Sequence, residues 1–193
     1  GLGALVEPGM RTLVLASLPV GFALGSLEVA VPAFAEAEGS AALAGVLLAV
    51  WSIGSGLAGL AWGATAGRFS VLAAHVRFAW LLPVAIAPLV LASSPLTMGV
   101  LVLLAGLPIA PLIASRNQLI DRVAPAGTAT EAFTWPLTAL VGGVSLGAAA
   151  GGVVVEASSW TGAVLVSIGV ATLGAIVVAS RQTTLARPRA AAG

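Results

Sequence analysis

The sequence predicts an all-α membrane protein with six transmembrane helices, arranged as two inverted groups of three. Of its 193 residues, 59% are hydrophobic and only 8% are charged, whereas a soluble domain carries about 25% charged residues because its surface must be solvated by water. Six apolar runs are each long enough to cross a bilayer core of about 30 Å, which needs roughly 20 helical residues. A tryptophan and glycine pattern in the second run returns in the fifth.

The apolar runs also set the domain organisation. Residues 1–11 form an N-terminal segment, residues 12–180 a transmembrane domain, and residues 181–193 a tail. Residues 12–92 and 95–180 are predicted to be the two repeats, and valine-rich stretches lack the two-residue alternation of a membrane barrel. The six predicted spans are residues 12–34, 41–64, 71–92, 95–114, 129–155 and 160–180.

The arginines predict the orientation. With six spans, all eight basic residues fall on one side of the membrane, and the loops on the other side carry only glutamates. Cytoplasmic loops are enriched in arginine and lysine, so both termini are expected in the cytoplasm of a bacterial cell. The arginines are Arg11, Arg68, Arg77, Arg116, Arg122, Arg181, Arg187 and Arg189, and the opposite glutamates are Glu36, Glu38 and Glu156.

Two glycine stripes indicate an internal duplication. Glycines four residues apart lie on one helix face, and in lipid such a face lets another helix approach to backbone distance. Because the second and fifth spans run in opposite directions, the repeated pattern favours an inverted duplication, the common plan of secondary transporters. The first stripe follows Trp51 and holds Gly59, Gly63 and Gly67; the second follows Trp135 and holds Gly143, Gly147 and Gly151.

Three stretches resemble a known family. Residues 59–68, GLAWGATAGR, resemble the glycine-aspartate-arginine loop between the second and third helices of a half of a major facilitator superfamily transporter. Gly67 and Arg68 match its closing residues, and Ala64 stands at its aspartate position. Residues 127–135, GTATEAFTW, resemble the start of that family's eleventh helix, and residues 143–151 resemble the small-residue face of the same helix. The chain, from about residue 10 to residue 182, is similar to the C-terminal six-helix half of an actinobacterial efflux-like member.

This resemblance implies alternating access, with a cavity between two six-helix halves that holds a small-molecule substrate. The first, second, fourth and fifth spans of this chain would line the cavity. Proton-coupled efflux by an antiporter is the expected activity. The second half would come from the same longer chain or from another copy. The start at Gly1 instead of a methionine favours a fragment, with Met10 as the other start.

Glu28 is the outstanding charge inside a predicted span. A buried acid costs a few kcal/mol unless it faces a cavity or a partner, so Glu28 is a candidate for proton coupling or for binding a substrate cation. The alternative is that Pro32 ends the helix early and leaves Glu28 at the membrane interface. Trp51 and Trp135 are candidates for flanking the same site, with packing in the bundle core as the alternative.

Three residues are candidates for a cytoplasmic gate. Glu131 opens the fifth span, where a carboxylate favours the helix dipole, and a cap or a lock with Arg116 is the simpler role. Arg116 is expected at a solvated helix end, with contact to an anionic substrate as the alternative, and Arg68 belongs to the loop motif above. Bends are expected at Pro108, Pro111 and Pro136.

Other functional classes have less support. With no cysteine and one histidine, the chain lacks a thiol nucleophile or thiolate site, and we expect no metal, no cofactor and no nucleic acid. His75 is expected at the level of the lipid headgroups and Trp62 in an interfacial belt. An intramembrane enzyme would need a catalytic pair that we do not find, and a non-transporting scaffold or assembly subunit is the remaining alternative.

Overall fold

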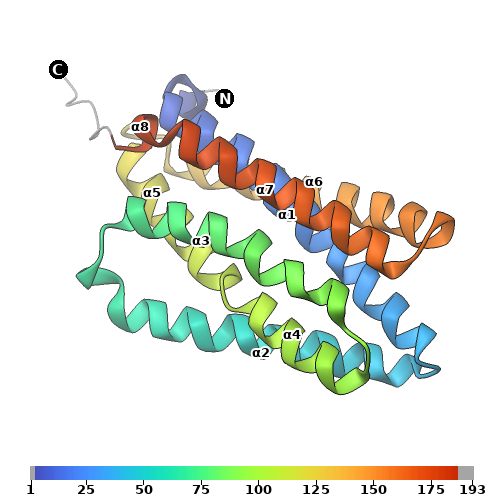
Figure 1. Ribbon diagram of the computed structural model, residues 1–193. Helices are drawn as coiled ribbons and strands as arrows, with labels where there is room; N and C mark the ends of the chain where they lie inside the picture. Colours follow the sequence, from blue (N-terminus) through green and yellow to red (C-terminus); the bar gives the residue numbers. More distant parts are fainter. Residues whose placement is uncertain (1–2, 187–193) are drawn as a thin grey trace.

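The computed structural model describes residues 3–186 and is all-α, with six helical spans long and apolar enough to cross a membrane (Figure 1). This is the makeup of a multi-span membrane protein. The long helices are α1 (Pro8–Ala37), α2 (Ala41–Thr65), α3 (Val71–Ile86), α4 (Pro95–Gly106), α5 (Ile109–Val123), α6 (Ala129–Ala157) and α7 (Trp160–Ser180), followed by the short α8 (Gln182–Leu185). Short 3₁₀ segments are η1 (Gly3–Val6), η2 (Ala66–Arg68) and η3 (Ala87–Leu91).

Local chemistry explains where the helices begin. Ser94 and Thr97 form a reciprocal capping box in front of α4, which then begins with a proline at its first position. The Ser159 hydroxyl accepts a hydrogen bond from the Gly162 N–H at the start of α7. The turns before α2 and α6 each contain a glycine with positive φ, Gly39 at 77° and Gly127 at 79°.

Prolines act differently in different spans. The fourth span, expected to end at residue 114, continues to Val123 but is broken between α4 and α5 at Leu107 and Pro108. Pro108 has no N–H to donate to the preceding turn, which accounts for the interruption. Helix α6 passes through Pro136 and α1 through Pro32 without ending. The alternative that Pro32 ends the first helix is therefore wrong, because α1 continues to Ala37; membrane helices tolerate an internal proline.

Helix α1 lies at the centre of the bundle and packs against α2, α6 and α7 (Figure 1). In its most apolar window 61% of residues are buried, against 17% for both the second and the fifth span. The hydroxyl groups of Ser26 and Ser167 tie α1 to α7, donating to the carbonyls of Ala163 and Ala23 at 3.0 and 2.5 Å. The second and fifth spans thus carry the largest uncovered apolar faces.

Glycines allow the closest helix contacts. A Cβ added to Gly143 or Gly147 of α6 would overlap the backbone of α1 at Leu18 or Phe22, and Gly151 meets Ser26 in the same way. Gly21 and Gly25 of α1 face the same contact from the other side, and Gly54 and Gly106 serve the contact between α2 and α4. Small residues at a membrane helix interface let backbones approach, as here.

The first glycine stripe is used only in part. A Cβ at Gly59 would lie 2.9 Å from the Cβ of Ala110 in α5, so these helices are close at that level. Gly63 and Gly67 have nothing within 4 Å of such a Cβ. Helix α2 diverges from α5 toward η2 (Figure 1), whereas α6 stays against α1 along its length.

The loop arginines gather at one end of the bundle, where Glu7 is also found, and the loops at the other end carry glutamates. Arg11, Arg68 and Arg122 lie at the end where α1 begins, together with Arg181 at the end of α7; we name this the arginine end. Glu36, Glu38 and Glu156 lie at the other end, near the α1–α2 and α6–α7 connections. Arg187 and Arg189 lie outside the described residues.

Candidate functional site

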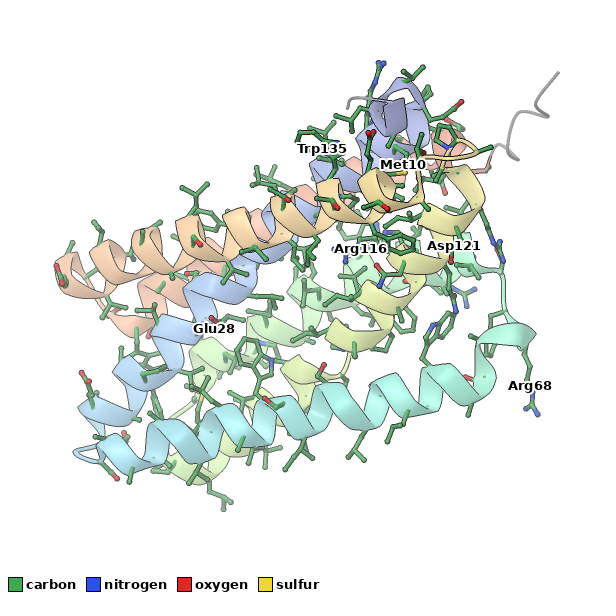
Figure 2. All side chains as sticks on the ribbon, turned by 180° about the vertical axis from the view of Figure 1, so that it is seen from behind. Met10, Glu28, Arg68, Arg116, Asp121 and Trp135 are labelled. Carbon is green, nitrogen blue, oxygen red and sulfur yellow. The ribbon has the colours of Figure 1, made fainter. Side chains whose placement is uncertain are left out.

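A groove opens beside Glu28, between α1, α2 and α5. Its volume is about 650 Å³, and Leu24 and Glu28 of α1 face Trp51, Ser52 and Ser55 of α2 across it. Glu28 is exposed in the chain and lies in the middle part of the bundle (Figure 2). Three spans that are distant in sequence therefore bring a carboxylate and two hydroxyl groups to one concave surface.

The groove lies far from either helix end. Helix α1 continues nine residues beyond Glu28, about 14 Å at 1.5 Å per residue, before it ends at Ala37. Ser52 is eleven residues into α2, about 16 Å from the same end of the bundle. Helix α1 has 30 residues and is longer than a bilayer core of about 30 Å, so Glu28 lies about 8 Å from the helix centre toward the Ala37 end, whereas Ser52 is near the centre of α2. An ion or polar group in the groove would therefore be inside the membrane, displaced from the midplane toward that end.

Trp51 forms the floor of this groove. Its side chain is 8% exposed, and its indole Nε1 is a buried donor without a partner among the described residues. Its backbone packs against Gly106 of α4, which holds the indole in place. A flat aromatic surface near a carboxylate is suited to an apolar or cationic group.

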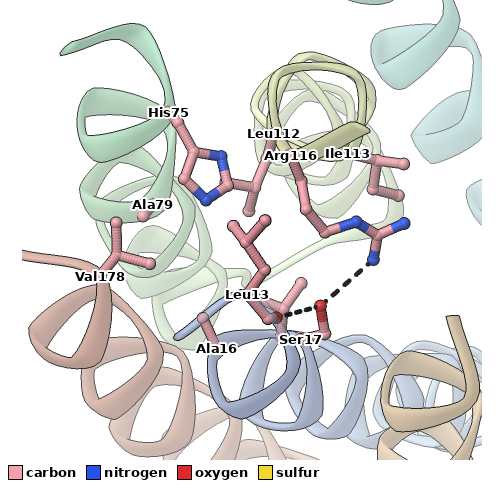
Figure 3. A pocket seen from close by; sticks show the side chains of 10 residues that line it. Leu13, Ala16, Ser17, His75, Ala79, Leu112, Ile113, Arg116 and Val178 are labelled. Atoms are coloured by element: carbon pink, nitrogen blue, oxygen red, sulfur yellow. Dashed lines mark hydrogen bonds between the residues drawn. The ribbon is translucent and has the colours of Figure 1, made fainter. Parts of the chain in front are cut away.

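Arg116 is buried, and the expectation of a solvated helix end is wrong. Only 8% of the residue is exposed, because α5 extends beyond it for two turns and α1 covers its guanidinium. Nη1 donates to the Ser17 hydroxyl at 3.4 Å (Figure 3). Nε and Nη2 donate to Asn117 Oδ1 at 3.2 and 3.1 Å. All these acceptors are neutral.

His75 is also buried, contrary to the expectation that it lies among headgroups. It is 3% exposed, and Nδ1 lies 3.0 Å from the Ser115 hydroxyl. That hydroxyl donates to the Leu112 carbonyl at 3.0 Å, so Nδ1 is the donor to Ser115. Figure 3 shows His75 and Arg116 facing one cavity of about 20 Å³, which has the volume of roughly one water molecule.

The remaining candidates lie apart from the groove. Trp135 packs in a second apolar cluster with Met10 near the arginine end (Figure 2), so it does not flank the site of Trp51. Glu131 accepts a hydrogen bond of 3.3 Å from the Ala4 N–H of the N-terminal segment. Arg68 is exposed at the end of η2, which follows α2 (Figure 2). The three gate candidates are thus brought to one end of the bundle but not into one cluster.

Some side-chain pairs of the candidate site were not predicted from the sequence. Ser17 and Arg116 are 99 residues apart in the sequence, and His75 and Ser115 are 40 residues apart. No local sequence pattern predicts either pair. Gly21 and Gly25, by contrast, have the four-residue spacing of the stripes and could have been recognised. Within residues 3–186, no group of three metal-ligating side chains is assembled. No family model matches the sequence, and a search of curated proteins finds no match.

Proposed function

We propose that this chain is one six-helix half of a secondary transporter of the major facilitator type, which moves a small molecule by alternating access against a second half. The observation that carries the proposal is the groove at Glu28. An ionisable residue exposed at membrane depth, in a concave surface lined by hydroxyl groups and an indole, suits a proton or substrate site more than a lipid-facing surface.

The packing pattern supports an inverted repeat. Under an inverted repeat, the first span (α1) corresponds to the fourth (α4 with α5), the second (α2) to the fifth (α6), and the third (α3) to the sixth (α7). The contact of α1 with α6 then corresponds to the contact of α4 and α5 with α2, and both contacts are made at glycines. In the same way, the contact of α1 with α7 corresponds to the contact of α5 with α3. The corresponding helices α3 and α7 also pack on each other. Inverted three-helix repeats occur within each half of major facilitator transporters.

The bare helices supply the surface for a second half. The second and fifth spans are the least buried, and under the repeat they occupy equivalent positions. A pair of equivalent apolar faces on either side of a groove fits a partner related by symmetry. Proton-coupled efflux follows from this proposal if Glu28 gains and loses a proton as the groove opens to each side.

Single-cysteine labelling tests the groove, because the chain has no cysteine of its own. Ser52 is exposed in the groove, so Ser52→Cys in the membrane-embedded full-length protein should react with a water-soluble, membrane-impermeant maleimide. Ser167→Cys is the matched control because Ser167 is 0% exposed and should not react. A scaffold with a dry bundle would leave both positions unlabelled, and that result would refute the transporter proposal.

The carboxylate itself is tested by Glu28→Gln. This substitution keeps the size of the side chain but removes its charge, so we expect loss of substrate movement driven by a pH gradient in proteoliposomes. Substrate exchange without a gradient should persist, because the alternating movement does not require the charge. Unchanged gradient-driven transport in Glu28→Gln would exclude a coupling role for this residue.

A further inference from the structure

A second cavity lies outside the groove, on the side where α2 diverges from α5. It has a volume of about 990 Å³ and lies between the last third of α2, the facing side of α3 and the break between α4 and α5. Its walls are apolar over most of their length. They include Leu57, Ala61, Phe78, Leu81, Leu104 and Pro111.

The length of this cavity matches one leaflet of a membrane. Along α2 its lining extends from Leu57 to Arg68, eleven residues or about 16 Å. Half of a bilayer core of about 30 Å is about 15 Å. Along α3 the lining continues to Ala85, fourteen residues or about 21 Å from the start of the helix. The cavity therefore reaches from the arginine end of the bundle to the midplane or slightly past it, which is deep enough for one acyl chain.

Two arginines stand at its mouth. Arg68 and Arg77 both line the cavity, both are exposed, and neither makes a hydrogen bond or ion pair with another residue of the described range 3–186. Arg77 lies six residues into α3, about 9 Å from its start. A guanidinium at that depth is costly in hydrocarbon unless it reaches the interface or pairs with an anion.

The interior of the cavity is shaped by Trp62. Its ring packs edge-on against Phe78 with centroids 5.3 Å apart, and the residue is 6% exposed. Its Nε1 is a buried hydrogen-bond donor without a partner among the described residues, whereas most buried donors in proteins are hydrogen-bonded. Gly63 and Gly67 leave the neighbouring α2 surface bare. The expected role of Trp62 as an interfacial anchor facing the headgroups is therefore wrong.

We propose that this cavity binds one phospholipid with an anionic headgroup. Its phosphate would pair with Arg68 and Arg77, and one acyl chain would lie along α2 and α3 as far as Leu57 and Leu81. Charge complementarity selects this occupant: basic pockets between transmembrane helices at the cytoplasmic surface attract anionic headgroups. A neutral amphiphile would leave both guanidinium groups without a counter-charge.

Lipid add-back followed by native mass spectrometry tests the site on the full-length protein. Delipidated protein in detergent is mixed with phosphatidylglycerol or with phosphatidylcholine of the same acyl chains. We expect one phosphatidylglycerol to bind roughly 10- to 30-fold more tightly than phosphatidylcholine, the gain that two arginines near a charged headgroup give. Arg68→Gln with Arg77→Gln should remove this preference.

Three controls make the result specific. Arg122→Gln removes an exposed arginine at the same end of the bundle but outside the cavity, and should keep the preference. Ala61→Phe keeps both arginines but fills the cavity, and should weaken binding of both lipids. Inorganic phosphate at millimolar concentration should not displace the lipid, because it supplies no acyl chain.

Several outcomes would overturn the proposal. They are equal binding of the two lipids, a preference that survives in the double arginine variant, and binding that is unaffected by Ala61→Phe. Absence of any bound lipid in the original protein would overturn it as well. The substituted arginines are exposed, so circular dichroism and gel filtration of the variants are expected to match the original protein.

Discussion

The burial of Arg116 is not explained by a gain in the folding stability of the protein. Its guanidinium is buried and donates only to neutral oxygens of Ser17 and Asn117 within the described part of the chain. Burying a charge is expensive, and hydrogen bonds to neutral groups recover only part of the cost. A group kept at such a cost is a functional candidate, in agreement with its proposed place at the cytoplasmic gate.

We expect Arg116→Met to keep or raise stability. Replacing a buried charged group by an apolar one of similar volume is often neutral or stabilising by about 1–4 kcal/mol. Thermal unfolding in detergent measures this, and transport in proteoliposomes should fall in the same variant. Strong destabilisation by Arg116→Met would show that the guanidinium is a structural element instead.

Ser17→Ala should act in the opposite direction. It removes an acceptor for Arg116 Nη1 and leaves the guanidinium with fewer partners in a buried place. The expected loss is about 1–3 kcal/mol of unfolding free energy. Ser145→Ala is the matched control, because its hydroxyl is exposed and bonds only to the Val141 carbonyl of its own helix. Equal effects of the two substitutions would contradict the importance of the Arg116 contact.

At the scale of elements, the pairing of α1 with α6 depends on glycine. Gly143 and Gly147 face the α1 backbone directly, and Gly21 and Gly25 do so from the opposite helix. Without a water-driven hydrophobic effect between helices in lipid, association depends on van der Waals contact and interhelical hydrogen bonds. Small residues at the interface therefore set how close these two spans lie.

Alanine substitution on α6 should separate packing glycines from exposed ones. Gly147→Ala places a Cβ on the Phe22 backbone, so the helices must move apart, at a cost of about 1–3 kcal/mol. Gly142→Ala has nothing within 4 Å of the added Cβ and should be neutral or stabilising, since alanine is the better helix former. Unfolding in detergent compares the two, and similar stabilities would argue against the close contact.

At the scale of the whole molecule, charge varies along the length of the bundle and burial varies across its width. Along the bundle, the loop arginines lie at one end together with Glu7, and Glu36, Glu38 and Glu156 lie at the other. Across it, α1 is central, whereas the second and fifth spans are mostly uncovered. The first division predicts an orientation in the membrane and the second predicts where a partner half would pack.

Labelling of loop cysteines tests the orientation. Glu38→Cys lies in the connection between α1 and α2, and Ala126→Cys lies between α5 and α6; both positions are exposed. Since the arginine end is expected to face the cytoplasm, an impermeant maleimide should label Glu38→Cys in intact cells and Ala126→Cys only after permeabilisation. The reverse pattern, or labelling of both in intact cells, would disprove this orientation.

Much of the fold follows from the sequence alone. The starts of the helices at Ala41, Val71 and Pro95, and the bounds of α7, agree with those read from apolar runs. Hydropathy and helix-start chemistry are local properties of consecutive residues, and lipid requires backbone hydrogen bonds to close within each helix. The break at Pro108 was foreseen as a bend, but its size depends on whether neighbours restore the lost hydrogen bond.

What only the tertiary structure decided is which faces meet. The burial of His75 and Arg116, the pairing of Arg116 with Ser17, and the use of Gly147 but not Gly63 depend on the rotation and tilt of helices distant in sequence. The same local pattern is compatible with several such arrangements, because most of the helices, α5 excepted, present apolar residues nearly all around. The sequence therefore determined the spans and the charges of the loops between them, because both are properties of consecutive residues. The groove at Glu28, in contrast, exists only because three of those spans come together.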